Sequence, residues 1–180
     1  MVVATLDANA RLQAAITPSR SVLFYTLTAT LPLIAIAAVL LFTKVDGRGL
    51  LLLSVLGCVV GFVGLGRLLY EIILDVAGFP DYKLPIWSVF YLIIYVISSF
   101  TFLFYALVRG APGVYFDGVS RDAKGGYLDA LYLSLSNYIG VAPDPGITMP
   151  SRTGRFLSVG QGTLALFINL VIITKFVNTF

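Results

Sequence analysis

Three long uncharged runs constrain the fold of this chain more than any other feature of its sequence. Residues 22–43, 49–66 and 84–108 contain no Asp, Glu, Lys or Arg. A helix that crosses the hydrocarbon core of a bilayer needs about 20 predominantly apolar residues. Each run therefore predicts a transmembrane helix, and the second helix is expected to continue to about residue 75. A fourth span is predicted at 156–174, which is also uncharged.

The composition agrees with a membrane protein and argues against most enzymatic chemistry. The chain is 58% hydrophobic and 12% charged, with a mean hydropathy of +0.94, whereas soluble domains carry about 25% charged residues. There is no His, and the one cysteine, Cys58, lies inside an apolar run. The commonest zinc sites and the Cys and His nucleophile arrangements therefore cannot be built from this sequence. We predict no catalytic residue, no metal site and no enzymatic activity.

The segments between the runs are short and rich in charges, Gly and Pro. Residues 44–49 predict a tight turn, so the first two helices should be antiparallel. A second turn cluster follows at 76–85. Residues 21–83 are thus expected to form a two-helix peripheral hairpin. It is preceded at 1–20 by an N-terminal tail or interfacial helix, which lacks the pattern of a cleaved signal peptide. The net charge of +3 is spread over the loops, and no binding of nucleic acid is predicted.

Small residues recur along one face of the second span. They lie three or four positions apart and include a GxxxG motif: Ser54, Gly57, Gly61 and Gly64. Such a stripe lets two helix backbones approach closely in a membrane, where apolar burial gives no net drive for helix association. We interpret the stripe as a helix-packing surface and not as a ligand site.

The last third of the chain has an unusual order of elements. Residues 127–136 form an amphiphilic segment that is too short to span a bilayer, and a loop rich in Gly, Pro and Asp follows at 137–150. Unpaired backbone groups are costly in lipid, so this loop cannot face lipid. A segment that enters the membrane and turns back, buried by protein or reached by water, meets both conditions. It leads into an apolar helix predicted at 156–177.

Two parts of this region resemble the tetrameric pore-loop cation channels of the potassium-channel type. Residues 127–135, YLDALYLSL, resemble the pore helix of that family. Residues 154–156, GRF, followed by QG at 161–162 and an apolar helix, are similar to the start of its inner helix. The resemblance covers the last third of the chain and the span before it, and it is carried by the order and spacing of these segments.

The resemblance implies an all-α membrane protein with four transmembrane helices and a re-entrant pore helix and loop between the third and fourth. It divides a pore module, residues 84–180, into an outer helix at 84–108, a pore helix at 127–136, a filter-like loop at 137–150 and an inner helix at 156–177. It further implies a homotetramer in the lipid bilayer of the cell membrane, passage of monovalent cations (potassium or sodium) and cytoplasmic termini. The distribution of Lys and Arg over the loops favours the opposite orientation.

The filter-like loop departs from the family pattern. Potassium channels carry Thr-Val-Gly-Tyr-Gly-Asp, whose carbonyl groups replace the hydration shell of the ion, whereas residues 137–145 are NYIGVAPDP. One glycine remains there, and prolines fix φ and lack an amide donor. We therefore expect a channel that is not strictly potassium-selective, or else a non-conducting or accessory membrane protein that retains the channel scaffold. The expected filter backbone is Tyr138, Ile139, Gly140, Val141 and Ala142.

Five further residues are candidates for roles in or beside the pore. Asp144 is predicted either to attract cations at the pore mouth or to serve as a turn residue in Pro-Asp-Pro-Gly. Asp129, early in the pore helix, is expected to interact with the helix dipole. Gln161, Ala165 and Asn169 share one face of the inner helix. Their polar members need water or a partner at membrane depth, so this face is predicted to line a cavity or to hydrogen-bond to another helix.

Overall fold

The described part of the chain is helical. The computed structural model describes residues 20–42, 47–78 and 86–177, so the predicted N-terminal segment lies almost wholly outside the described residues. Within them the structure contains helices and one isolated β-bridge. The helices, in chain order, are α2 (Arg20–Phe42), α3 (Gly47–Gly78), α4 (Ile86–Gly110), α5 (Ala123–Ile139) and α6 (Arg152–Val177). The all-α fold class is therefore confirmed.

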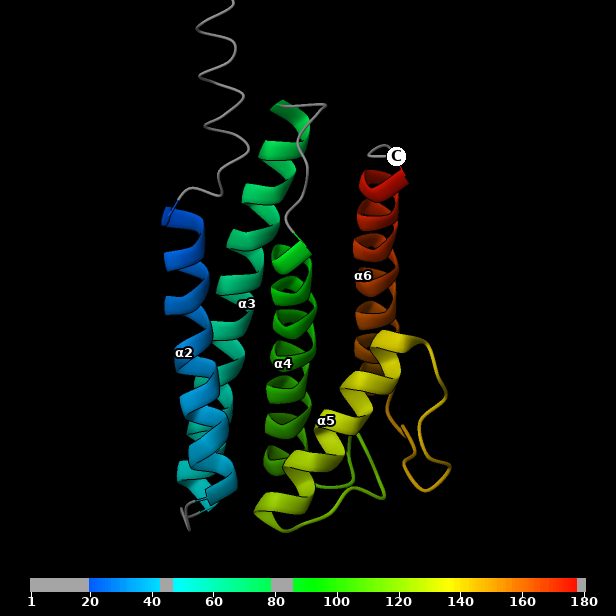
Figure 1. Cartoon of the computed structure of the whole chain (residues 1–180). Helices are drawn as coiled ribbons and strands as arrows, with labels where there is room; N and C mark the ends of the chain where they lie inside the picture. Colours follow the sequence, from blue (N-terminus) through cyan, green and yellow to red (C-terminus); the bar gives the residue numbers. More distant parts are fainter. Residues whose placement is uncertain (1–19, 43–46, 79–85, 178–180) are drawn as a thin grey trace, which may run out of the picture.

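Four helices are long and run in alternating directions, whereas α5 is shorter and inclined to them (Figure 1). The long helices match the four predicted apolar helices to within a few residues at most of their ends. α2 and α3 are antiparallel, as the charged turn between them predicted. α3 and α4 share the most extensive helix interface of the described chain. α2, α3 and α4 therefore lie side by side in chain order, α5 packs against α4, and α6 packs against α5.

The stripe of small residues on α3 faces α4. A Cβ atom placed on each glycine would lie 2.5 to 2.8 Å from a side chain of α4, which is closer than real Cβ contacts allow. The pairs are Gly57 with Phe102, Gly61 with Ser99 and Gly64 with Tyr95. Ser54 is fully buried and donates to the Leu50 carbonyl of its own helix at 2.6 Å. The packing role predicted for this stripe is confirmed.

Buried aromatic rings hold the end of α4 to the segment that starts α5. Phe104 packs edge-on against Phe116 of the α4–α5 loop, with ring centroids 5.0 Å apart. Tyr105 packs edge-on against Tyr127 of α5 at 5.7 Å, and its hydroxyl donates to the Ala123 carbonyl at 3.0 Å. Such aromatic pairs contribute about 0.5–1.5 kcal/mol beyond their burial. They fix the point at which α5 departs from α4.

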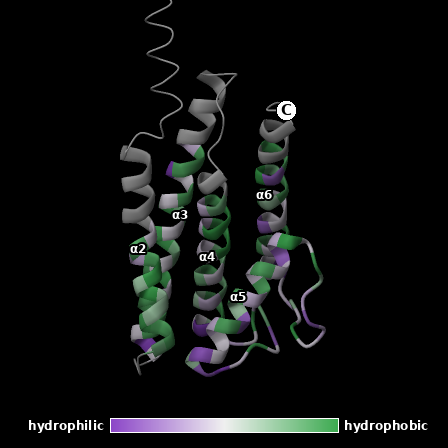
Figure 2. Ribbon diagram, in the orientation of Figure 1, coloured by the Kyte–Doolittle hydropathy of each residue, from purple (hydrophilic) through white to green (hydrophobic). Residues whose placement is uncertain are grey.

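Two described helical segments are long and apolar enough to cross a membrane. They are Gly47–Tyr70 of α3 and Phe90–Gly110 of α4; in α2, the residues whose side chains are described form a shorter apolar segment, Thr30–Phe42. Large apolar side chains remain exposed on α2 and α3, such as Leu31 at 62% and Val63 at 68%. Figure 2 shows the described part of α2 and much of α3 coloured as hydrophobic. Exposed apolar surface is typical of contact with a membrane or a partner.

α6 is less apolar than α3 and α4. Polar residues and glycines interrupt its sequence, and no segment of α6 up to residue 171 meets the same condition of length and apolarity. The structure therefore supports association with a membrane through α3 and α4.

Candidate functional site

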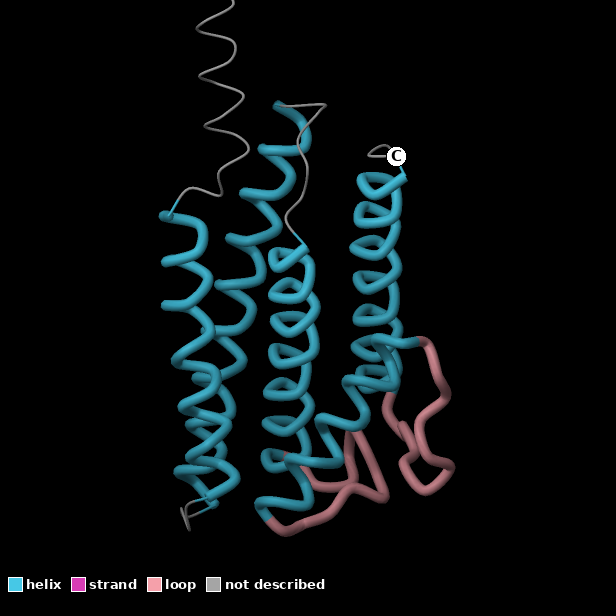
Figure 3. The backbone as a smooth tube through the Cα atoms, in the orientation of Figure 1, coloured by secondary structure: helices cyan, strands magenta, loops and turns pink. Residues whose placement is uncertain are grey.

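α5 and its flanking segments form an excursion that begins and ends at the same end of the bundle (Figure 3). Asp117, before α5, and Thr148, after it, form an antiparallel bridge with backbone N–O distances of 2.9 and 3.0 Å. Gly118 has a left-handed φ of 79° beside this bridge, and a Cβ there would lie 1.8 Å from the Gly146 carbonyl oxygen. Glycine alone fits this approach. The bridge therefore closes the excursion at its base.

α5 begins earlier than predicted, at Ala123, because Asp122 caps it. The Gly125 amide donates to the Asp122 carboxylate at 2.8 Å, an N-cap arrangement. This bond, helped by the Ser120 hydroxyl, lowers the pKa of the Asp122 carboxyl. Asp129 consequently lies beyond the first turn, to which the effect of the helix dipole is confined, and its carboxylate accepts from the Ser120 amide at 2.7 Å. The dipole role predicted for Asp129 is wrong, since this residue holds the preceding loop.

α5 also ends later than predicted and takes in part of the expected filter. Tyr138 and Ile139 are helical, and the helix is capped by Gly140 with φ 80° and ψ 23°. The amides of Gly140 and Val141 donate to the Ser136 carbonyl at 2.9 and 3.0 Å, a left-handed glycine cap. The prediction that Tyr138 and Ile139 form filter backbone is wrong. Their backbone groups remain in the helix because the left-handed cap falls at Gly140, which is the first glycine after Gly126.

The loop that follows α5 is rich in free carbonyl groups and poor in free amides. Pro143 and Pro145 have no N–H, and the Gly146 amide donates to the Asp144 carboxylate at 2.8 Å. Among the described residues, no protein donor bonds to the backbone carbonyls of residues 141–143. Backbone oxygens without a protein donor therefore outnumber the free N–H groups of this loop.

Asp144 acts as a turn residue in this loop. Its Oδ1 accepts from the Gly146 amide, and its carbonyl accepts from the Ile147 amide at 2.8 Å. Asp favours turns because its side chain can accept from the backbone two residues on. Its side chain is nevertheless exposed. The turn role is thus observed, and attraction of cations at a pore mouth stays a prediction.

Gln161 joins α6 to α5 at a fully buried position. Its Nε2 donates to the Ser134 carbonyl at 2.9 Å and to the Ser134 hydroxyl at 2.7 Å. Ser134 in turn donates to the Ile97 carbonyl of α4 at 2.8 Å. Gln161 is 0% and Ala165 is 1% exposed, so neither has surface with which to line a cavity. The cavity role predicted for these two residues is wrong, and Gln161 instead makes the helix-to-helix hydrogen bond that the sequence left open.

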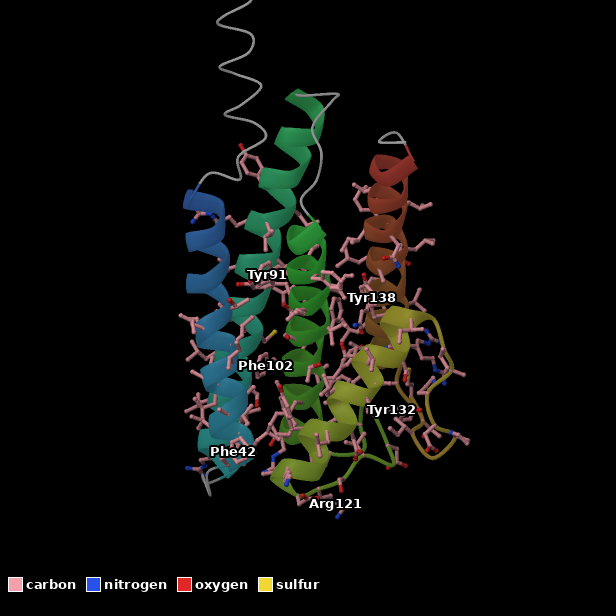
Figure 4. All side chains as sticks on the ribbon, in the orientation of Figure 1. Phe42, Tyr91, Phe102, Arg121, Tyr132 and Tyr138 are labelled. Atoms are coloured by element: carbon pink, nitrogen blue, oxygen red, sulfur yellow. The ribbon has the colours of Figure 1, made fainter. Side chains whose placement is uncertain are left out.

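Further polar contacts extend this junction along both helices. Asn137 Nδ2 lies 3.1 Å from the Ser158 hydroxyl and 3.4 Å from Gln161 Oε1. The Tyr138 hydroxyl donates to Asn169 Oδ1 at 3.1 Å, and Figure 4 shows Tyr138 beside α6. Asn169 is half-buried, so its place in a cavity stays a prediction. We define the α5–α6 polar seam as this set of residues: Ser134, Asn137, Tyr138, Ser158, Gln161 and Asn169.

Three members of the seam were not predicted from the sequence: Ser134, Asn137 and Ser158. A signal for them was present, because polar residues lie three apart at 134 and 137, and again at 158 and 161. Residues with this spacing share a helix face. Two polar faces on helices that follow each other in the chain would have indicated a polar interface between them.

The start of α6 is pressed against the α4–α5 loop. The Ser151 hydroxyl accepts from the Gly154 amide at 2.9 Å. A Cβ at Gly154 would lie 2.5 Å from the Tyr115 carbonyl oxygen, so glycine permits this approach. Arg155 donates from Nε to the Met149 carbonyl at 2.9 Å. The Gly-Arg pair that contributes to the family resemblance therefore anchors α6 to both loops at the base of the excursion.

Comparisons with family models, with curated proteins and with solved structures find no match for the chain. In the part of the chain that the structure describes, no group of three or more His, Cys, Asp or Glu side chains could hold a metal ion. The geometry of the loop and the polar seam therefore carries the functional argument.

Proposed function

We propose that the chain is one subunit of a homotetrameric channel in the cell membrane, which conducts the monovalent cations potassium or sodium without strict potassium selectivity. In this proposal the four long helices cross the bilayer, and α5 enters it and stops partway. The observation that carries the proposal is the closed excursion of α5, with the Asp117–Thr148 bridge at its base and a donor-poor loop at its end. One copy presents one such loop and cannot enclose a path, whereas four copies around an axis can.

The length and inclination of α5 support an excursion into the membrane. α5 has 17 residues, about 25 Å at a rise of 1.5 Å per residue, which is less than the roughly 30 Å of a hydrocarbon core. It is also inclined to the long helices (Figure 1). The loop that follows would then lie at membrane depth, where free carbonyl groups cannot face lipid. A water-filled path on the axis of an oligomer would satisfy them.

The chemistry of the loop favours cations over anions. Carbonyl oxygens and carboxylates attract positive ions in channel filters and mouths, whereas anions are bound by backbone N–H groups. Two prolines remove such donors from the loop, and the glycine cap uses the amides of Gly140 and Val141. The exposed carboxylate of Asp144 adds negative charge beside the loop. We therefore expect cation conduction.

The short loop argues against strict potassium selectivity. A potassium filter replaces the hydration shell of the ion with successive rings of carbonyl oxygens. Tyr138 and Ile139 keep their backbone groups in α5, so fewer rings can form than in a filter of five residues. An ion would then retain part of its hydration shell, and discrimination between potassium and sodium would fall.

Ion flux through the reconstituted chain tests this proposal. The chain is purified into liposomes, and cross-linking establishes that the tetramer is intact. We expect potassium and sodium currents, radioactive potassium and sodium flux, and no chloride flux. Protein-free liposomes prepared in the same way serve as the control. An intact tetramer that passes neither current nor cation flux would exclude the proposal.

A second candidate is a non-conducting or accessory membrane protein that retains the scaffold. The helical state of Tyr138 and Ile139 favours it, as does Pro143 in the loop. If the native chain conducts no ions, substitution of residues 139–143 by Thr-Val-Gly-Tyr-Gly distinguishes the two candidates. A gain of potassium-selective current would indicate a pore-forming scaffold whose native loop does not conduct. If the substituted chain forms an intact tetramer and still conducts no ions, the accessory role is favoured.

A further inference from the structure

Gln161 is the fully buried member of the polar seam on α6. We propose that it is a positioning residue: it fixes the last turns of α5 against α6 and thereby sets the place of the loop at residues 140–147. In the channel, this placement would set the relative permeability of potassium and sodium. The positioning rests on contacts between described residues, and its effect on permeability rests on the proposed function.

The contacts of Gln161 determine the orientation of its side chain. Its Nε2 donates to the carbonyl and hydroxyl oxygens of Ser134, at 2.9 and 2.7 Å, and its Oε1 lies 3.4 Å from Asn137 Nδ2. A buried amide that loses its partners incurs the desolvation penalty of that group, so rotation away from α5 is unfavourable. Ser134 is itself held to Ile97 of α4 at 2.8 Å. A continuous series of hydrogen bonds therefore links α6 to α5 and α5 to α4.

This series of hydrogen bonds lies directly before the C-terminal end of α5. Ser134 and Asn137 flank Ser136, whose carbonyl accepts the Gly140 amide at 2.9 Å. From Ser134 to Gly140 the helix rises about 9 Å, at 1.5 Å per residue. A shift or rotation of α5 at Ser134 would thus be carried to the start of the loop. The position of the loop therefore depends on where Gln161 holds α5 along α6.

Small residues bring the backbones of α5 and α6 close together in this part of their contact. A Cβ at Gly162 would lie 3.6 Å from the Asn137 carbonyl oxygen, and Ala165 is the next small residue buried along α6. Small residues let two backbones approach closely, and polar side chains then hydrogen-bond across the helices. The hydrogen bonds of the seam therefore contribute to the register of α5 along α6 together with the buried apolar residues Leu133 and Ile168, and Gln161 makes hydrogen bonds that are fully buried.

Gln161→Met tests the proposal because methionine has a similar length and cannot donate hydrogen bonds. Thr163→Val is the matched control, since Thr163 is exposed on the same helix and its hydroxyl donates to the Val159 carbonyl of that helix at 2.9 Å. Two quantities are measured on the full chain in liposomes. The first is the permeability ratio of potassium to sodium, from the reversal potential. The second is the rate of hydrogen exchange at the Gly140 and Val141 amides.

We expect Gln161→Met to change the permeability ratio and to speed exchange at both amides by about two- to tenfold, the factor that corresponds to the loss of one hydrogen bond. Thr163→Val should leave both quantities at wild-type values. Ser134→Ala removes the hydroxyl at the other end of the contact and should act in the same direction. It replaces Gln161→Met if that variant does not assemble. The double variant should be non-additive, because the two side chains interact directly.

The two measurements separate this inference from the proposed function. A wild-type tetramer that passes no ions would exclude the channel, and the exchange rates would still decide whether Gln161 positions the loop. Unchanged exchange in Gln161→Met, or an equal change in Thr163→Val, would overturn the positioning role. Faster exchange with an unchanged permeability ratio would overturn the link to selectivity.

Discussion

Single residues decide where α5 begins, where it ends and how the chain returns to its base. Asp122 caps the start of the helix, and Gly140 ends it in a left-handed conformation. Gly118 lets the returning loop approach so closely that a side chain at that position would collide with it. Asp122 is needed for its carboxylate acceptor. Gly118 and Gly140 are needed because they lack a Cβ.

The turn role and the charge of Asp144 can be separated by substitution. Asp144→Asn keeps an Oδ1 acceptor for the Gly146 amide, since Asn also favours turns, and removes the charge. We expect this variant to reduce cation conductance in 0.01 M salt and to have little effect in 1 M salt, because the Debye length falls from about 30 Å to about 3 Å. Single-channel conductance in the two salt solutions measures this difference.

Asp144→Glu provides the complementary variant. It keeps the charge and moves the carboxylate away from the geometry that accepts the Gly146 amide. Conductance close to wild type in Asp144→Glu, with a loss in Asp144→Asn, would support the role at the pore mouth. Equal conductance of wild type and Asp144→Asn in dilute salt would contradict that role and leave Asp144 as a turn residue.

At the scale of elements, the helices pack by two different means. α3 and α4 approach through glycines that face aromatic and hydroxyl side chains, whereas α5 and α6 are joined by buried hydrogen bonds. The first interface depends on shape, since backbones approach where side chains are missing. The second depends on polar partners, since a buried amide without one is unfavourable.

Gly61→Leu should disrupt the α3–α4 interface. A Cβ at Gly61 would lie 2.5 Å from Ser99 Oγ and 3.1 Å from Ser99 Cα, and the remaining leucine atoms would add to the overlap. Overpacking of this kind typically costs about 1–3 kcal/mol, so we expect a fall of that size in the free energy of unfolding. Denaturant titration in detergent micelles measures it.

Gly66→Leu is the matched control for that substitution. Gly66 lies on the same helix, is exposed, and has no atom within 4 Å of an added Cβ. This variant should be at least as stable as the wild type, because leucine is a better helix former than glycine by roughly 1 kcal/mol. Equal stability of the two variants would contradict the close packing of α3 against α4.

At the scale of the whole molecule, the proposed channel places the base of the α5 excursion on one side of the membrane. The family resemblance implies the extracellular side, whereas the distribution of Lys and Arg favours the cytoplasmic side. Both loops that flank α5 meet at this base through the Asp117–Thr148 bridge. A single labelled position near the bridge therefore reports the orientation of the complete excursion.

Lys124→Cys in a Cys58→Ser background provides that position. Lys124 is exposed in the first turn of α5, and Cys58 is the one native cysteine. We expect a membrane-impermeant thiol reagent to label this variant in intact cells, as the resemblance implies. The Cys58→Ser chain alone should remain unlabelled. Protection in intact cells, with labelling after lysis, would reverse the orientation.

The fold was largely predictable from the sequence, and the candidate site was predictable only in part. Long uncharged runs and the small-residue stripe are local, periodic signals, and they indicated the long helices and the face that α3 presents to α4. The filter prediction failed at Tyr138 and Ile139 because the end of α5 depends on which residue takes the left-handed cap. The cavity prediction failed at Gln161 because a polar helix face can meet water or another helix, and periodicity is the same in both cases.

The sequence by itself therefore determined the four long helices, their approximate bounds and the small-residue face of α3, because apolar length and residue spacing are properties of the chain alone. Only the tertiary structure decided that Gln161 contacts Ser134, that Asp129 holds the preceding loop and that Asp117 pairs with Thr148. These contacts depend on the angle of α5 to its neighbours. That angle is set by packing between residues far apart in the sequence, which no local pattern specifies.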